Sequence, residues 1–287
     1  MRNNPTSVIE SPSGKDADYE NFPVGSWLLP AAVRPHIAIF YTFARAIDDI
    51  ADSPDLDPQT KVERLNGFEQ AILGANTENP VYETGHRMRS SLLETGLTLQ
   101  HCLDLLTAFR QDAVKSRYDD WDDLVAYCQL SAAPVGRLLI DLHGGSDDGY
   151  GPSDALCIAL QVINHLQDCQ DDYLTLDRVY LPGDWMAAAL ANVTDLAADR
   201  AAPGIRIVLD RCLDKTASLL DESRALPGGL RSRRLAMESQ AIINIADRLV
   251  DCLRRQDPLA GRVKLSRGGY LWCCVQGAAH ALLSGQR

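Results

Sequence analysis

The apolar residues of this chain recur at three- and four-residue steps through almost its whole length. That spacing places them on one face of an α-helix, and the alternating segments with hairpin turns that typify strands are missing. The pattern therefore predicts an all-α helical bundle. We expect helices at residues 32–52, 59–74, 79–95, 98–117, 121–144, 153–175, 204–224, 230–256 and 268–284.

Prolines refine this helical pattern at two places. Pro58 follows Asp57, an arrangement typical of a helix start. Pro134 lies inside the 121–144 run and is followed by Gly136. Because a proline removes a backbone hydrogen bond and kinks a helix, the segment SAAPVGR is predicted to be a bent helix. The alternative is a helix that ends near Ala133.

The domain organisation predicted from the sequence is simple. Residues 1–19 are polar and lack the apolar stretch of a signal peptide, which predicts a loose N-terminal segment and a cytoplasmic protein. No linker composition marks a boundary within residues 20–287, so we expect one domain there. The eight cysteines show neither CxxC nor Cys/His ligand spacing, which argues against zinc, and most of them are predicted to be reduced residues of the core.

Charge and hydropathy exclude some partners. The net charge of −11 argues against nucleic acid as a ligand. The longest apolar stretch, residues 268–283, is interrupted by Gln276 and His280 and is too short to span a bilayer. It is predicted to form a buried terminal helix. Peripheral contact with the inner membrane stays open as an alternative location, and the sequence does not predict the oligomeric state.

The segment QVINHLQDCQDDYLTLDRVYLP carries a row of polar side chains with helical spacing. Asn164, Asp168 and Asp172 lie four residues apart, which would stack them along one helix face at a rise of ~6 Å per step. Like charges at this spacing repel each other, and a divalent cation held by oxygen ligands would neutralise them. The alternative is a solvated acidic helix end. His165 points off this face and is predicted to be a packing or surface residue.

A second acidic helix is predicted at FYTFARAIDDIAD. Tyr41, Arg45, Asp48 or Asp49, and Asp52 recur on one face at three- and four-residue steps. Mg²⁺ commonly takes one or two carboxylates and completes its coordination with water and phosphate oxygens, so two such helices suit a diphosphate substrate. The alternative for this helix is a simple ion pair between Arg45 and Asp49.

The two acidic segments, DDIAD and NHLQDCQDD, resemble the paired aspartate-rich motifs of the squalene/phytoene synthase family. The similarity continues through NFPVGSWLLP, YTFARAIDDIAD, YCQLSAAPVG and DRVYLP and covers the chain from Asn21 to about Arg267. It implies a single-domain isoprenoid-synthase helical bundle with a central active-site cavity. It also implies that Asp48 and Asp172 face each other across the mouth of that cavity.

A finer resemblance concerns activity. AFRQDAVKSRYDDWDDL, SAAPVGR and DPLAGRVKLSR are most similar to bacterial hopanoid-pathway members of the family. This implies a Mg²⁺-dependent enzyme, with Mn²⁺ as the alternative metal, that ionises presqualene diphosphate. Rearrangement and capture by water would give hydroxysqualene and diphosphate. NADPH is not expected, and no GxGxxG motif follows a strand. The alternatives are a presqualene diphosphate, squalene or phytoene synthase that condenses two prenyl diphosphates, and a non-catalytic assembly-factor relative.

The resemblance also implies roles for individual residues. It implies five oxygen ligands for the metal: Asp48, Asp52, Asn164, Asp168 and Asp172. The four aspartates are also the implied catalytic residues. Candidates for binding the isoprenoid diphosphate are Tyr41, Arg45, Gln129, Arg178, Tyr180, Arg262, Lys264 and Arg267. For the last three, the alternative is a solvated basic loop. Aromatic residues that could line a carbocation cavity are Phe22, Trp27, Phe40 and Tyr41.

The chain departs from the common family pattern inside the second motif and in mid-chain. Gln167 stands where many members have an arginine, and Gln129 stands where a tyrosine is frequent. Gln170 and Asp171 replace a common glycine and glutamate. Loss of a positive charge weakens the case for holding two diphosphates together. These differences fit a member that performs only the second half-reaction.

Overall fold

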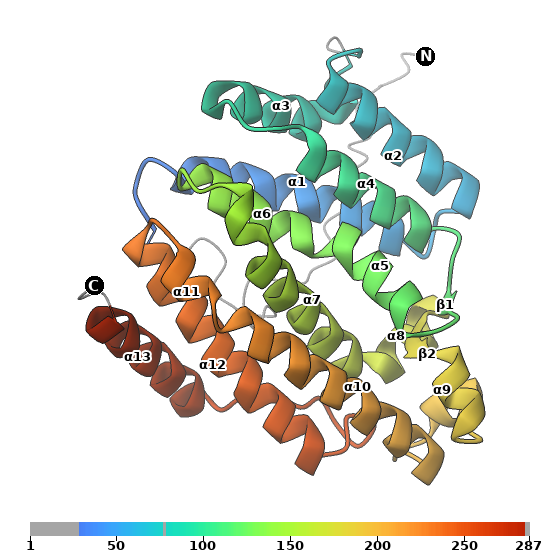
Figure 1. The fold of residues 1–287 in the computed structure, drawn as a ribbon. Helices are drawn as coiled ribbons and strands as arrows, with labels where there is room; N and C mark the ends of the chain where they lie inside the picture. Colours follow the sequence, from blue (N-terminus) through green and yellow to red (C-terminus); the bar gives the residue numbers. More distant parts are fainter. Residues whose placement is uncertain (1–28, 77–78, 285–287) are drawn as a thin grey trace, which may run out of the picture. The chain divides into compact units, whose positions relative to one another are not determined.

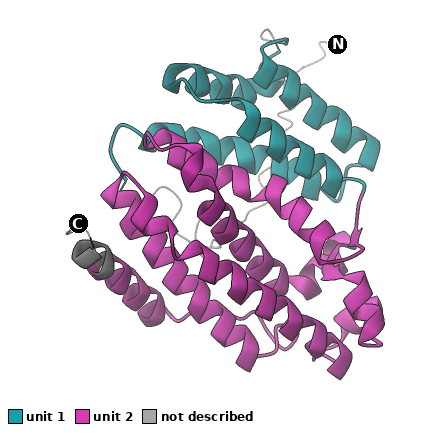
Figure 2. Ribbon diagram, viewed as in Figure 1, with its two compact units in different colours: residues 1–114 teal, residues 115–287 magenta. Residues whose placement is uncertain are grey.

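The computed structural model describes residues 29–76 and 79–284 and is helical in most of them (Figure 1). The chain divides into two compact units, residues 1–114 and 115–287 (Figure 2). We describe each unit by itself. The all-α class predicted from periodicity is confirmed, whereas the single domain and its central cavity stay predictions. No helix in the described part of the chain is both long and apolar enough to cross a bilayer.

The described residues of unit 1 form four helices and one 3₁₀ turn, Pro80–Tyr82. The helices are α1 (Arg34–Asp52), α2 (Pro58–Leu73), α3 (Glu83–Thr95) and α4 (Gln100–Asp112). α1 packs against the other three, and its apolar face supplies the fully buried side chains of Phe43 and Ile47. The α2 start follows the predicted pattern, because the carboxylate of Asp57 accepts a hydrogen bond from the Thr60 backbone N–H at 3.0 Å.

One boundary predicted in unit 1 is wrong. We expected a helix to run from 98 to 117, but α4 ends at Asp112. The chain then enters unit 2 and forms a short strand, β1 (Arg117–Tyr118), which pairs in parallel with β2 (Val179–Pro182) of the same unit. This long-range pairing overrides the local helical pattern. It forms a small two-stranded sheet for which the sequence has no periodic signal.

Unit 2 holds the longer helices. They are α5 (Trp121–Ser131), α6 (Ala133–Leu142), α7 (Tyr150–Gln167), α8 (Cys169–Leu176), α9 (Gly183–Ala188), α10 (Pro203–Ser223), α11 (Leu226–Gly229), α12 (Arg233–Arg255) and α13 (Arg267–Ser284). Short 3₁₀ turns occupy Asp147–Gly149 and Val193–Ala197. α7 packs against α6, α10 and α12, and α12 packs against α13, so α7 is the central helix of this unit.

Two predicted helices of unit 2 are each interrupted. The 121–144 run breaks at Ala132, and Pro134 lies in the first turn of α6, where its missing N–H breaks no intrahelical bond. The prediction of one bent helix through SAAPVGR is therefore wrong, and the alternative of a helix that ends near Ala133 is closer, because α5 ends at Ser131 and α6 begins at Ala133. The 153–175 helix begins earlier, at Tyr150, and breaks at Asp168, whose φ of −107° and ψ of 9° are not helical. The prediction of one continuous helix through the second acidic motif is wrong.

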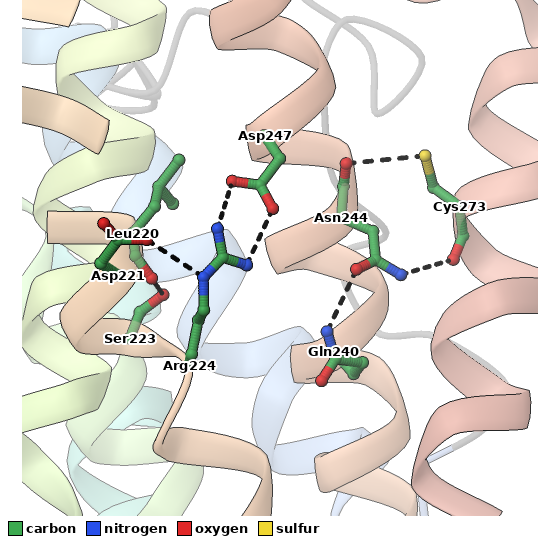
Figure 3. A network of polar contacts seen from close by, with 8 residues as sticks. All are labelled: Leu220, Asp221, Ser223, Arg224, Gln240, Asn244, Asp247 and Cys273. Atoms are coloured by element: carbon green, nitrogen blue, oxygen red, sulfur yellow. Dashed lines mark hydrogen bonds and ion pairs between the residues drawn. The ribbon is translucent and has the colours of Figure 1, made fainter. Parts of the chain in front are cut away.

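Polar contacts join α12 to the end of α10 on one side and to α13 on the other (Figure 3). Arg224 donates two hydrogen bonds to the Asp247 carboxylate, at 3.0 and 3.1 Å, and a third to Asp221 at 3.2 Å. Asn244 on α12 donates to the Cys273 carbonyl on α13 at 3.4 Å. Hydrogen bonds to Asp247 raise the pKa of Arg224. The contacts between Asn244 and Cys273 join α13 to α12.

α13 is only partly buried. Cys273 is 1% exposed, and a Cβ at Gly277 would lie 2.6 Å from the Ala241 backbone, so the α12 and α13 backbones approach closely on this side. The other side of α13 exposes Leu271, Trp272 and Val275, each by more than half. The prediction of a buried terminal helix is therefore wrong for that face. Hydrophobic periodicity predicted the position of this helix, but it does not show which of its faces packs against another helix.

Candidate active site

The first acidic motif lies on an uninterrupted stretch of α1, where Arg45 is its counter-charge. One guanidinium nitrogen of Arg45 lies 3.2 Å from Asp48 Oδ2, and another lies 3.5 Å from Asp49 Oδ1. Both distances follow from helical spacing of three and four residues. The pairing of Arg45 with Asp49 that the sequence allowed is present, and Asp48 shares the same arginine. Tyr41 and Asp52 are half-buried on the same helix.

The second acidic motif keeps its four-residue spacing across the helix break. The Asp168 N–H donates to the Asn164 carbonyl at 3.0 Å, and the Asp172 N–H donates to the Asp168 carbonyl at 2.8 Å. All three side chains are half-buried. Asp168 itself is the C-cap of α7 and the N-cap of α8, so its side chain projects from a bend rather than from a regular helix face.

The counter-charge of the second motif comes from a distant part of the sequence. Arg262 lies 94 residues after Asp168, and its guanidinium nitrogen lies 3.3 Å from Asp168 Oδ2. Arg178 is buried beside the motif, and its backbone N–H donates to the Asp172 carbonyl at 3.1 Å. Lys264 and Arg267, the other members of the predicted basic group, are exposed. The structure therefore joins Arg262 and Arg178 to the acidic motif directly.

A column of aromatic rings stands behind the second motif. The His165 ring stacks on Tyr180 with centroids 3.6 Å apart, and Tyr180 in turn contacts Tyr118 at 5.5 Å and Tyr127 at 5.6 Å. Burial, together with the nearby positive charge of Arg178, lowers the pKa of His165 to about 3. The imidazole is neutral at physiological pH. His165 is thus a packing residue, and of the two predicted roles the surface one is wrong.

The remaining predicted site residues lie in the core, at the surface or outside the described residues. Phe40 is a core residue of unit 1, 4% exposed, and Gln129 has an exposed side chain on α5. Phe22 and Trp27 lie outside the described residues. Whether Asp48 faces Asp172 stays a prediction, because these residues belong to different units. Cys169, inside the second motif, is buried, and burial raises the pKa of its thiol to about 12, which removes it as a nucleophile.

The donor set fits a hard divalent cation that also takes ligands from a substrate. In the part of the chain that the structure describes, no three side chains of His, Cys, Asp or Glu are grouped as a complete metal site. Each motif instead offers one or two half-buried carboxylates a helical turn apart, with the Asn164 amide beside the second. Mg²⁺ accepts such incomplete oxygen sets, because water and phosphate oxygens supply its other ligands.

Sequence reasoning missed two residues of this region. Gln167 is 3% exposed and donates from its side-chain amide to the Val263 carbonyl at 2.5 Å, in the same segment as Arg262. Gln170 donates to the carbonyls of Leu196 and Ala198, at 3.1 and 2.8 Å. Both had been singled out only as departures from a family pattern. Their partners lie 96 and 26 to 28 residues away, so no local signal identified them.

The chain is similar in sequence to enzymes of one family over most of its length. The family described as squalene/phytoene synthase matches residues 16–269. A hydroxysqualene synthase of Rhodopseudomonas palustris is 46% identical over 260 residues, covering 91% of this chain and 88% of the relative. A second one, of Zymomonas mobilis, is 39% identical over 274 residues, covering 95% of this chain and 91% of the relative.

Solved structures agree with these sequence similarities. The crystal structure of the squalene synthase HpnC from Alicyclobacillus acidocaldarius is 33% identical, with a TM-score of 0.71, covering 83% of this chain and 89% of that chain. A dehydrosqualene synthase in complex with a ligand has a TM-score of 0.77 at 20% identity, covering 96% of this chain and 95% of that one. The second similarity concerns the fold alone.

Proposed function

Since the chain belongs to the squalene/phytoene synthase family, we propose that it is a hydroxysqualene synthase acting in squalene and hopanoid biosynthesis. The reaction ionises presqualene diphosphate, rearranges the resulting cation and captures it with water. One observation carries the proposal: similarity at 39 to 46% identity to hydroxysqualene synthases extends over 86 to 95% of this chain. Both acidic motifs lie inside the matched region.

We propose Asp48, Asp52, Asn164, Asp168 and Asp172 as the residues that hold Mg²⁺ or Mn²⁺, with Asp48, Asp52, Asp168 and Asp172 essential for catalysis. A bound divalent cation neutralises the charge of a departing diphosphate and so lowers the ionisation barrier. The pairing of Asp48 with Arg45 and of Asp168 with Arg262 supports the proposal. Each guanidinium already compensates a carboxylate, and each could turn to a diphosphate oxygen instead.

The remaining candidates bind the substrate or guide its cation. Arg178, Arg262, Lys264 and Arg267 would supply positive charge to the single leaving group. Tyr41 lies one helical turn before Arg45, where its ring could stabilise a nearby carbocation by cation–π attraction. We propose that Tyr180 acts through the ring column that supports the second motif. Gln129 is proposed to orient the water that captures the cation.

The decisive experiment supplies presqualene diphosphate and Mg²⁺ without NADPH, in water labelled with ¹⁸O. The proposal requires release of diphosphate and a hydroxysqualene that carries the label, because no hydride donor competes with water. Farnesyl diphosphate alone should give little presqualene diphosphate. Efficient formation of squalene or phytoene from farnesyl or geranylgeranyl diphosphate would replace this function by a condensing synthase. Lack of turnover with every substrate would favour a non-catalytic relative.

We further infer a cytoplasmic protein that contacts the inner membrane peripherally, because its substrate and product partition into lipid. The exposed Leu271, Trp272 and Val275 of α13 support this, since tryptophan favours the boundary between lipid and water. Sedimentation with phospholipid vesicles tests the contact. Replacing Leu271 and Trp272 by serine should reduce the bound fraction, whereas an unchanged fraction would remove α13 from the contact.

A further inference from the structure

Two adjacent residues at the end of α7 contact two adjacent residues of the segment between α12 and α13. Gln167 donates its side-chain amide N–H to the Val263 carbonyl, and Asp168 accepts from Arg262. We call these four residues the clasp. Gln167 and Val263 are 3% and 1% exposed, whereas the side chains of Asp168 and Arg262 are 23% and 25% exposed. The clasp therefore has a buried neutral half and a solvent-accessible charged half.

The two halves of the clasp differ in how firmly they can hold the backbone next to Arg262. A solvent-accessible ion pair is weak by itself, because water screens it and a long arginine side chain loses freedom on pairing. A buried amide–carbonyl hydrogen bond is more persistent, since breaking it leaves polar atoms without water to replace the partner. The neutral half is thus the part of the clasp that fixes the backbone next to Arg262.

The segment that carries Arg262 has a second anchor at its start. Asp257 accepts a hydrogen bond from the Ala201 N–H at 2.8 Å and another from the Leu259 N–H at 3.0 Å. With Asp257 fixed on one side and Val263 on the other, the backbone around Arg262 is restrained at both ends. The guanidinium can then exchange Asp168 for another anion by rotating its own side chain, without movement of the loop.

We propose that Gln167 is a positioning residue: its amide, by fixing Val263, presents Arg262 to the diphosphate bound at the second acidic motif. The proposal rests on the proposed function. It gives the departure from arginine at position 167 a physical meaning. The Gln167 amide fixes Val263 without adding a second cation that would compete with Arg262 for Asp168.

Gln170 provides a matched control three residues along the chain. Its side-chain amide also donates to backbone carbonyls, but those of Leu196 and Ala198, in and just after the 3₁₀ turn Val193–Ala197. The same substitution at the two positions removes the same type of bond from different segments. Only the change at position 167 should affect the segment that contains Arg262.

The test compares the full-length wild type with Gln167→Met, Gln170→Met, Arg262→Met and the double variant Gln167→Met/Arg262→Met. Methionine retains the side-chain length but has no donor. Hydrogen exchange followed by mass spectrometry should show faster exchange at 259–266 in Gln167→Met, but not in Gln170→Met. Calorimetric titration with inorganic pyrophosphate in the presence of Mg²⁺ should show affinity lowered by about tenfold in Gln167→Met. With presqualene diphosphate, KM should rise more than kcat falls.

The double variant separates positioning from general loss of structure. If Gln167 acts through Arg262, its substitution should cause no further loss of pyrophosphate affinity once Arg262 is gone. Equal losses with and without Arg262, or unchanged exchange at 259–266, would overturn the proposal. A wild type that binds no pyrophosphate would overturn it together with the proposed function. A wild type that binds pyrophosphate but makes no alcohol would overturn the function alone.

Discussion

The two acidic motifs obtain their counter-charges in opposite ways. On α1, Arg45 pairs with Asp48 and Asp49 from the same helix, at distances set by helical geometry. At the end of α7, Asp168 pairs with Arg262, which is 94 residues away and depends on a buried glutamine for its place. The Arg45 pairs of the first motif can form as soon as their helix forms. The Asp168–Arg262 pair forms only when the tertiary structure of unit 2 has formed.

Substitutions in the two motifs should therefore differ in how many contacts they disturb. A change in the first motif alters charges that stay on one rigid helix. A change in the second motif alters a bend, a neighbouring loop and an ion pair together, because Asp168 caps α7 and α8 and contacts Arg262. We therefore expect local, independent effects in α1 and coupled effects around Asp168.

The largest expected effect is the loss of turnover in Asp168→Asn. The amide is nearly isosteric but is a poorer metal ligand, so kcat/KM should fall by about 10³-fold or more, while the helical circular dichroism signal stays unchanged. Asp171→Asn is the matched control, because Asp171 lies in the same motif with an exposed side chain. Near-normal turnover of Asp168→Asn at limiting Mg²⁺ would remove Asp168 from the metal site.

Glu238 extends the contrast to a buried carboxyl group in unit 2. It is 5% exposed on α12, and its Oε2 has no hydrogen-bond partner among the described residues. Burial raises the pKa of Glu238 from 4.5 to about 7. Between these values the folded protein holds a proton that the unfolded chain has released. Its stability therefore falls as the pH rises from 4.5 to 7, and the loss is complete above pH 7.

Glu238→Gln should remove this penalty. Above pH 7, the variant should be more stable than the wild type by up to roughly 3 kcal/mol, and the difference should shrink toward pH 4.5. Urea unfolding at a series of pH values measures it. Glu222→Gln, an exposed change on α10, is the control and should show no such trend. A variant less stable than the wild type at pH 8 would mean that Glu238 has a stabilising partner.

Ligand binding tests whether the two motifs act together. Mg²⁺ and a non-hydrolysable diphosphate analogue should raise the melting temperature together by more than the sum of their separate shifts, because metal and diphosphate share oxygen atoms. A ligand at a hundredfold excess over its Kd stabilises by about 2.7 kcal/mol. Asp48→Asn and Asp168→Asn should each abolish the extra shift. If only one of them does so, the motifs bind their ligands separately.

What the sequence could predict follows the same division between local and distant contacts. Helical periodicity placed the long helices, and spacing alone indicated the Arg45–Asp49 pair, because both are local properties. The helix break at Asp168 could not be predicted, because no proline or glycine lies next to it in the sequence. The Gln167–Val263 bond and the partner of Asp168 depend on loops that only the tertiary structure brings near. The exposed face of α13 escaped prediction for the same reason.

The smallest expected effect concerns the first motif alone. A double-mutant cycle with Arg45→Met and Asp49→Asn should give a coupling energy of about 0.3–0.5 kcal/mol in the free energy of unfolding, the usual range for pairs at four-residue spacing on a helix. Half a molar of NaCl should reduce it, since salt screens solvent-accessible charges. The matching cycle with Arg262→Met and Asp168→Asn should give a larger coupling, because Gln167 and Asp257 already restrain the segment that carries Arg262, so that less conformational freedom is lost when the pair forms. Equal coupling energies in the two cycles would contradict this expectation, because Arg262 would then stabilise the fold through its aspartate no more than Arg45 does.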